Sequence, residues 1–168
     1  MIRKAFSMIE LVFVIVILGV LAAVAVPKFV ASRSDAKVAA LRSDIATALK
    51  TIPSRIFAEN IDITNTNAPD GTSWSDWMID TAGLDKNTWG AAINPGGITP
   101  RTSSKIPIPC SSSGIIAIDN VKQTLVFDPD ALKATNQNSA DTVCVQLKNS
   151  YPSGSARTIP LGSNGLIF

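Results

Sequence analysis

The chain has 168 residues, of which 46% are hydrophobic and 17% charged, and its 15 basic and 13 acidic residues give a formal net charge of +2. A charge so close to zero supplies no strong basic field and therefore no signal for nucleic-acid binding. The sequence contains no histidine, which excludes Ser-His and Cys-His nucleophile arrangements as well as histidine metal sites, so we expect no enzyme and no catalytic residue.

The first predicted element is an apolar helix near the start of the chain. After the basic pair Arg3-Lys4, residues 6–26 are apolar or small except for one carboxylate, Glu10. This stretch has the length, roughly 20 residues, that an α-helix needs to cross a bilayer. A carboxylate in such a helix costs about 2.5–3.5 kcal/mol on insertion scales, so Glu10 requires a partner.

The residues around Glu10 resemble a known family pattern. A short basic leader at residues 1–5, then Phe6, then an acidic residue four positions later is similar to the N-terminal segment of type IV pilins and type II secretion pseudopilins. The resemblance implies that a prepilin peptidase cuts between Ala5 and Phe6 and methylates the new amine of Phe6. It also implies that Glu10 acts in filament assembly. Ala5 stands where the family more commonly has Gly, and beyond the first third of the chain the match is only architectural.

Two residues weaken this first helical segment. Pro27 lacks an N–H and crowds the carbonyl four residues back, which costs about 3 kcal/mol or more, and Gly19 costs about 1 kcal/mol relative to Ala. The resemblance implies that residues 19–27 lose helical hydrogen bonds when subunits pack into a filament. Close packing of helices in the membrane is the alternative use of Gly19.

Two other interpretations compete for the same segment. An ordinary secretory signal peptide would use Ala23-Val24-Ala25 as its cleavage site and release a soluble protein that begins at Val26. A single-pass anchor would instead hold a binding module that never polymerises. The length of the apolar stretch disfavours the first interpretation, and Glu10 is unexplained by the second.

The helix is predicted to continue with an amphipathic half. We expect one helix from residue 6 to about Ala58, roughly 80 Å long at 1.5 Å per residue, kinked but not ended by Pro53. Spacings of three and four place an apolar stripe on one face, suited to pack against a sheet, at Val38, Leu41, Ile45, Ala48, Leu49, Ile52 and Ile56.

Residues 60–109 are rich in Asn, Thr, Ser, Gly and Pro, which indicates a variable loop between helix and sheet. Within it, Ser73 is predicted to cap a short helix that carries Trp74 and Trp77 and stops at Gly83. We expect these aromatic side chains to pack into the core. A surface for a partner or a glycan is the alternative.

Four later segments are predicted as strands. Residues 114–118 and 123–127 flank Asp119-Asn120 and predict a hairpin, and residues 165–168 predict a final short strand. Residues 142–147 predict another strand, whose helix-facing positions are Val143, Val145 and Leu147. A long helix covering a small antiparallel sheet is an α+β fold, and the resemblance implies its pilin-like version.

These elements predict one head on one stalk. We expect a leader at residues 1–5, a transmembrane and filament-core helix at 6–27, an amphipathic half-helix belonging to the head at 28–59, and a globular head with loop and sheet at 60–168. About 110 residues after the helix suffice for one small core and are too few for two.

The two cysteines, Cys110 and Cys144, both lie in the predicted head. In an exported protein such a pair indicates a disulfide, which would contribute about 4 kcal/mol in the chain-entropy model. Two buried free thiols are the alternative. Disulfides of this kind are common in type IV pilins, so the resemblance favours a pilin slightly.

We expect no cofactor and no metal ligands. One polar loop at residues 128–141 offers oxygens to calcium, as a related loop does in major pseudopilins, but its spacing matches no EF-hand and a solvated turn is the favoured interpretation. The oxygen-bearing side chains of this loop are those of Asp128, Asp130, Asn136, Asn138 and Asp141.

The function implied by the resemblance is structural. The subunit would wait in the inner membrane as a single-pass protein with its head on the periplasmic side, and would then enter a periplasmic or cell-surface filament. Its partners would be identical or related subunits, the prepilin peptidase, the inner-membrane assembly machinery and inner-membrane lipid. The sequence leaves open whether the filament is a pilus, a secretion pseudopilus or a competence filament.

Overall fold

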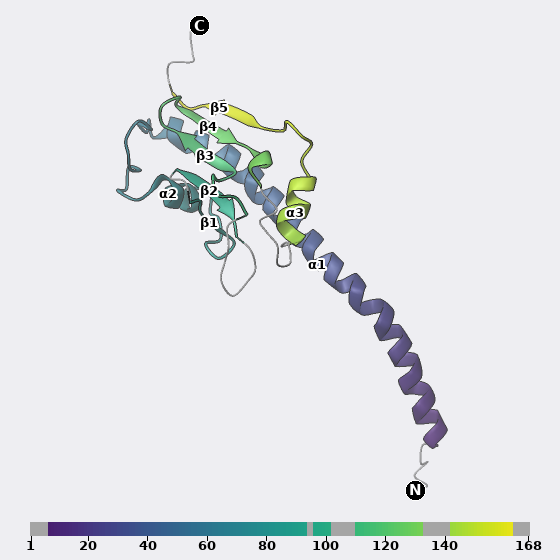
Figure 1. Cartoon of the computed structure of the whole chain (residues 1–168). Coiled ribbons are helices and arrows are strands. Elements are labelled where there is room, and N and C mark those ends of the chain that lie inside the picture. The colour runs from purple at the N-terminus through teal and green to yellow at the C-terminus, as the bar shows by residue number, and fades with distance from the viewer. Residues whose placement is uncertain (1–6, 94–95, 102–109, 133–141, 163–168) are drawn as a thin grey trace. The chain divides into compact units, whose positions relative to one another are not determined.

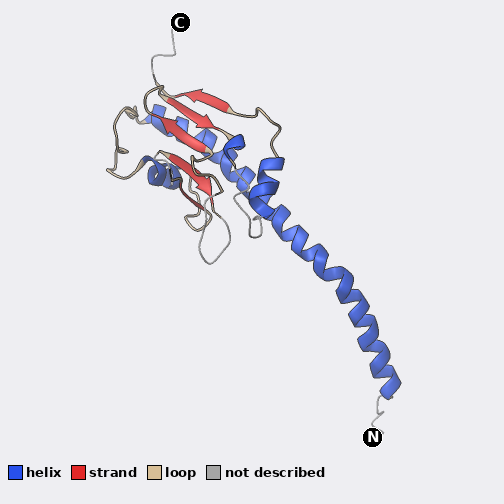
Figure 2. Ribbon diagram, viewed as in Figure 1, coloured by secondary structure: helices blue, strands red, loops and turns tan. Residues whose placement is uncertain are grey.

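The computed structural model describes residues 7–93, 96–101, 110–132 and 142–162, and within these the side chains of residues 24–32 and of Thr142 are not described (Figure 1). The described part is an α+β arrangement of helices and one antiparallel sheet (Figure 2). Its helical elements are α1 (Met8–Ala58), α2 (Trp74–Thr81), the 3-10 helix η1 (Pro129–Ala131) and α3 (Thr142–Asn149). Its strands are β1 (Trp89–Ala91), β2 (Gly97–Pro100), β3 (Ile116–Asp119), β4 (Thr124–Phe127) and β5 (Arg157–Pro160).

The chain divides into two compact units, Met1–Ala36 and Lys37–Phe168, and α1 runs through the boundary between them. The helix includes both Pro27 and Pro53 without ending, and its last residue is the predicted Ala58. Among the described residues, no helix combines the length and the apolar character that crossing a bilayer requires.

The second half of α1 packs into the core of the head through its apolar stripe. Ala48 and Ile52 are fully buried, Ile45 and Ile56 are 2% exposed, and Leu49 is partly buried against the same core. The predicted stripe is therefore confirmed. Each fully buried aliphatic side chain of this size contributes about 1.5–3 kcal/mol, so burial of the stripe stabilises this part of the helix.

The sheet has the strand order β1-β2-β3-β4-β5, and every neighbouring pair is antiparallel. β3 and β4 form the predicted hairpin, with Ile116 opposite Phe127 and Asp119 opposite Thr124. At its tip the Asp119 carboxylate accepts hydrogen bonds from the backbone N–H groups of Val121 (3.0 Å) and Lys122 (2.9 Å). This side-chain acceptor satisfies two N–H groups that the turn leaves unpaired.

The prediction of a strand at residues 142–147 is wrong, because this segment is helix α3. The alternation of Val143, Val145 and Leu147 is typical of a strand. The same segment also contains Cys144 and Leu147, whose spacing of three is typical of a helix. These two are the buried side chains of the helix, at 5% and 0% exposure, and they follow the helical period. The segment therefore packs as a helix, and the place beside β4 belongs to β5.

Three strands of the sheet were not predicted. β5 is an exposed edge strand with little apolar character, and β1 and β2 lie inside the segment predicted as loop. β2 is nonetheless fully buried, with Ile98 and Thr99 at 0% exposure. The final strand predicted at residues 165–168 lies outside the described residues.

Glycine allows the chain to approach itself closely beside β2. Gly114 has a positive φ of 78°, and a Cβ atom placed on it would lie 2.9 Å from Cα of Gly97. Real Cβ atoms do not approach backbone so closely, so a side chain at Gly114 would both strain the backbone and separate the two segments.

A disulfide joins Cys110 to Cys144 across 34 positions of sequence, with a Cα–Cα distance of 5.7 Å. The predicted bond is confirmed, and free buried thiols are excluded for this pair. Its second end lies on α3 rather than on the predicted strand. The bond therefore ties the chain before β3 to the helix that follows η1.

Candidate functional site

The first candidate surface is the apolar N-terminal part of α1. Every described side chain of residues 8–23 is exposed. The large apolar members range from 42% exposed at Ile17 to 85% at Met8. They occupy all sides of the helix instead of one stripe. A helix that is apolar all round is suited to complete burial in lipid or among other helices.

Glu10 is the only charged residue among residues 8–23. It lies in the first turn of α1, where the helix dipole favours a negative charge, and its backbone N–H donates to the carbonyl of Ser7 at 3.0 Å. No described side chain pairs with its carboxylate. The partner that its charge requires in apolar surroundings is thus absent from the described part of the subunit.

The structure describes only some of the other predicted site residues of this segment. Gly19 lies within the continuous helix, and a Cβ atom on it would meet nothing within 4 Å. Pro27 is helical in its backbone, while its side chain is not described. Ala5 and Phe6, the predicted cleavage and methylation residues, lie outside the described residues.

The second candidate surface, which we call the basic groove, is a depression of about 680 Å³ between α1, the β4–β5 edge and the segment that follows α3. Three of its lining residues are cationic, namely Arg42 and Lys50 on α1 and Arg157 on β5, and no lining residue is a carboxylate. The remaining lining residues are Ile45, Ala46, Leu49, Phe127, Ser150, Tyr151, Pro152, Ser155 and Ile159. Sequence reasoning missed this groove, because its charges are far apart along the chain.

Tyr151, the single tyrosine of the chain, lies in the basic groove. The Arg42 guanidinium lies over its ring at 5.6 Å from the centroid, and Phe127 meets it edge-on at 5.3 Å. Partial burial raises the pKa of Tyr151, and the positive charges of Arg42 and Arg157 partly oppose that rise. Both guanidinium groups therefore favour the ionised form of the same phenol.

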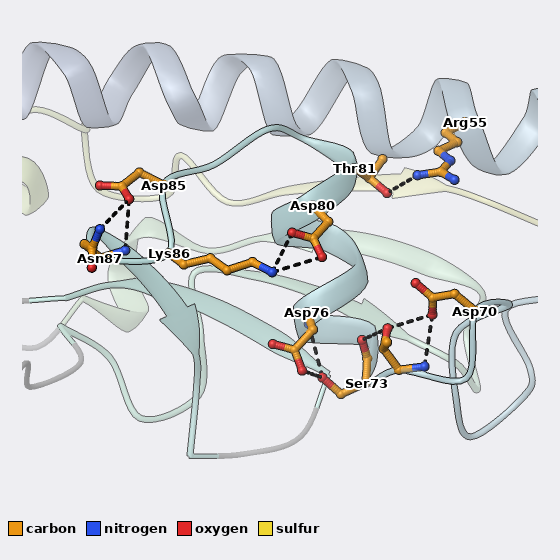
Figure 3. A network of polar contacts seen from close by, with 10 residues as sticks. Arg55, Asp70, Ser73, Asp76, Asp80, Thr81, Asp85, Lys86 and Asn87 are labelled. Atoms are coloured by element: carbon orange, nitrogen blue, oxygen red, sulfur yellow. Dashed lines mark hydrogen bonds and ion pairs between the residues drawn. The ribbon is translucent and has the colours of Figure 1, made fainter.

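The third candidate surface, which we call the acidic face, is formed by α2 and its flanking turns (Figure 3). Ser73 is the predicted N-cap of α2: its hydroxyl accepts from the backbone N–H of Asp76 at 3.1 Å and donates to the Asp76 carboxylate at 2.7 Å. One turn later, Asp80 forms an exposed ion pair with Lys86 at 2.8 Å. Carboxylates outnumber bases in this region, since residues 70–88 contain four carboxylates and one base.

Local hydrogen bonds keep several of these carboxylates ionised. The side-chain and backbone donors of Thr72 lower the pKa of Asp70, and the backbone N–H of Asn87 followed by the Thr88 hydroxyl lowers the pKa of Asp85. A lowered pKa means that the charge persists to more acidic pH than in a free carboxyl group. The negative charges of Asp70 and Asp85 are therefore stabilised by their own turns.

The aromatic side chains of α2 point into the core, as predicted. Trp74 and Trp77 are 4% and 2% exposed and meet edge-to-face with ring centroids 5.6 Å apart. Trp74 donates its indole N–H to the carbonyl of Asn65 at 2.9 Å, and Trp89 donates to the Asp44 carboxylate of α1 at 2.9 Å. These bonds anchor the segment that follows α1, and they leave the polar side of α2 at the surface.

The polar loop considered for calcium is only partly described. Asp128 accepts from the backbone N–H of Asp130 at 3.0 Å and caps η1, while Asn136, Asn138 and Asp141 lie outside the described residues. Among the residues that the structure describes, no cluster of three metal-binding side chains occurs. The calcium alternative to a solvated turn is therefore untested.

The chain matches no protein-family model, and comparison with curated proteins and with solved structures yields no similar protein.

Proposed function

We propose that the protein is a structural subunit of a filament of the type IV pilus or type II secretion pseudopilus class, and that it is not an enzyme. The supporting observation is the exposed apolar surface of residues 8–21 on α1, which surrounds the single carboxylate of Glu10. Apolar surface of this extent requires burial against lipid or protein. In a filament subunit, lipid surrounds this surface before assembly and other subunits surround it afterwards.

Before assembly, residues 6–26 would span the inner membrane, with the head on the periplasmic side. The structure describes the side chains of residues 7–23 of this segment. The basic residues Arg3 and Lys4 precede it, which favours a cytoplasmic start by the positive-inside rule. Prepilin peptidase would then cut after Ala5 and methylate the amine of Phe6.

During assembly, other copies of the helix would replace lipid around the same residues. The apolar environment is conserved in this exchange, so extraction from the membrane does not expose the segment to water. Glu10 of one subunit would pair with the Phe6 ammonium of the next. Two charges that are costly in apolar surroundings would then neutralise each other, whereas removal of one partner typically costs about 3–5 kcal/mol.

The filament's work would be mechanical, and two versions are consistent with these features. A pilus would extend from the cell for adhesion, motility or DNA uptake. A pseudopilus would remain short and push secreted proteins through the periplasm.

The state of the N-terminus tests the proposal most directly. The full chain, expressed together with a prepilin peptidase, is purified from membranes, and its N-terminus is determined by sequencing and intact mass. We expect a chain that begins with methylated Phe6. A start at Met1 would favour a simple anchored module, and a start at Val26 would favour a secreted protein with an ordinary signal peptide. Either result would overturn the filament proposal.

A further inference from the structure

The acidic face and the basic groove lie at opposite ends of the sheet. α2 packs against β1 and β2, so the acidic face lies at the β1 end of the sheet. The basic groove is lined by Phe127 of β4 and by Arg157 and Ile159 of β5, so it lies at the other end. Figure 2 shows the strands that separate the two ends. Opposite charges at opposite ends of one body favour association from head to tail over association of two like ends.

The cations of the basic groove have no carboxylate within ion-pair distance in the described part of the subunit, although the Asp130 carboxylate accepts from the backbone N–H of Gly154 next to the groove. Lys50 and Arg157 form no ion pair with a described residue, and Arg42 stacks on Tyr151 without a carboxylate partner. Like charges on the walls of one depression repel each other. An incoming carboxylate would relieve this repulsion, and the apolar side chains of Leu49 and Ile159 in the same depression would add contact area.

The acidic face presents exposed carboxylates that could bind the cations of the basic groove. Asp76 and Asp80 are four residues apart on α2 and therefore lie on the same side of the helix. Both are exposed, and the side chain of Asp80 is 58% exposed even with its ion pair to Lys86. The opposite side of α2 is held in the core by Trp74 and Trp77, so these carboxylates are presented by a fixed element.

We propose that the basic groove of one copy receives the acidic face of α2 from a second copy, as a lateral contact between heads in the filament. This inference rests on the proposed filament function. Because the two surfaces differ, the contact is heterologous, and a contact of that kind repeats without closing when its rotation generates a helix. The heads would then contribute to the assembly of the filament in addition to the apolar helices.

Charge reversal tests the contact. The full chain is expressed with its assembly machinery as wild type, Arg157→Glu, Asp80→Lys and the double variant, and filaments are recovered by shearing. We expect each single variant to lower the filament yield roughly tenfold, which corresponds to about 1.4 kcal/mol per contact. The double variant restores opposite charges across the contact and should recover most of the yield. Lys122→Glu is the matched control, because it reverses an exposed charge at the hairpin tip outside both surfaces.

A crosslinking experiment measures proximity independently. Both native cysteines are bonded to each other, so introduced cysteines supply the reactive thiols. Ser155→Cys at the basic groove and Asn87→Cys beside the acidic face, placed in one chain, should give a ladder of crosslinked species beyond the dimer. Each single-cysteine variant should give no ladder, because it carries only one half of the contact.

The outcomes separate the two proposals. Restored yield in the double variant, together with a ladder, supports the contact between heads. Suppose that the wild type forms filaments. Normal filament yield in both single reversal variants, or no ladder from the double-cysteine variant, would then overturn the contact between heads and leave the filament proposal standing. Absence of filaments from the wild type, with an unprocessed N-terminus, would instead overturn the filament proposal and the contact with it.

Discussion

Removing the disulfide between Cys110 and Cys144 should destabilise the head by an amount that its loop length predicts. The bond closes a loop of 34 positions, and the chain-entropy model assigns a loop of this size about 4 kcal/mol at 25 °C. Both cysteines are nearly completely buried, at 1% and 5% exposure, so a serine in either place would add the cost of a buried hydroxyl. The variant that avoids a buried hydroxyl, at the smaller cost of the two lost sulfur atoms, is therefore Cys110→Ala with Cys144→Ala.

The assay is denaturant unfolding of the full chain in detergent, followed by tryptophan fluorescence. The three tryptophans, Trp74, Trp77 and Trp89, are all buried in the head and report on its unfolding. We expect the double alanine variant to lose about 4 kcal/mol of unfolding free energy, and Cys144→Ser with Cys110→Ala to lose more. A loss below about 1 kcal/mol would refute the loop-closure reasoning. If the unreduced, denatured wild type contained two thiols that react with an alkylating agent, the disulfide would be absent from the protein.

Three further predictions concern processing, assembly and the core. Ala5→Glu should block cleavage and leave unprocessed precursor in the membrane fraction, because the peptidase must accept a small residue at the cut; a chain starting at Phe6 from this variant would refute the leader assignment. Glu10→Lys should abolish filaments recovered by shearing while leaving insertion and cleavage intact, and Glu10→Gln should be milder because it retains a hydrogen-bonding group; normal yield from Glu10→Lys would contradict the ion-pair role. Ile52→Ala, at a fully buried position of α1, should lower the free energy of unfolding by about 2–5 kcal/mol, whereas Phe57→Ala, at a position 55% exposed, should lower it far less. Equal losses would contradict the assignment of Ile52 to the core.

Short-range patterns were sufficient for the elements whose signals are local. The stripe on α1 repeats over many turns, and the Ser73 cap with its following aromatic residues specifies α2 within a few positions. The β3–β4 hairpin likewise combines two alternating segments with a polar turn. Each of these interactions links residues that are close in sequence, so their spacing carries the information.

The errors occurred where the deciding contacts are distant in sequence. Residues 142–147 contain both an alternating and a helical pattern, and burial of Cys144 and Leu147 in the core favours the helix. β1 and β2 are three and four residues long, too short for a reliable period, and they form because they pair with each other and with β3. Pairing between strands depends on the assembled sheet and is invisible in either strand alone.

The sequence by itself determined the long helix with its exposed apolar start, the place of Glu10 within it, and the pair of cysteines available for a bond. Only the tertiary structure decided where the head's charges lie. Arg42, Lys50 and Arg157 are far apart along the chain, and folding brings them to the basic groove because α1 passes beside the β4–β5 edge of the sheet. A surface built from separate elements depends on how those elements pack, and packing follows from contacts across the whole head.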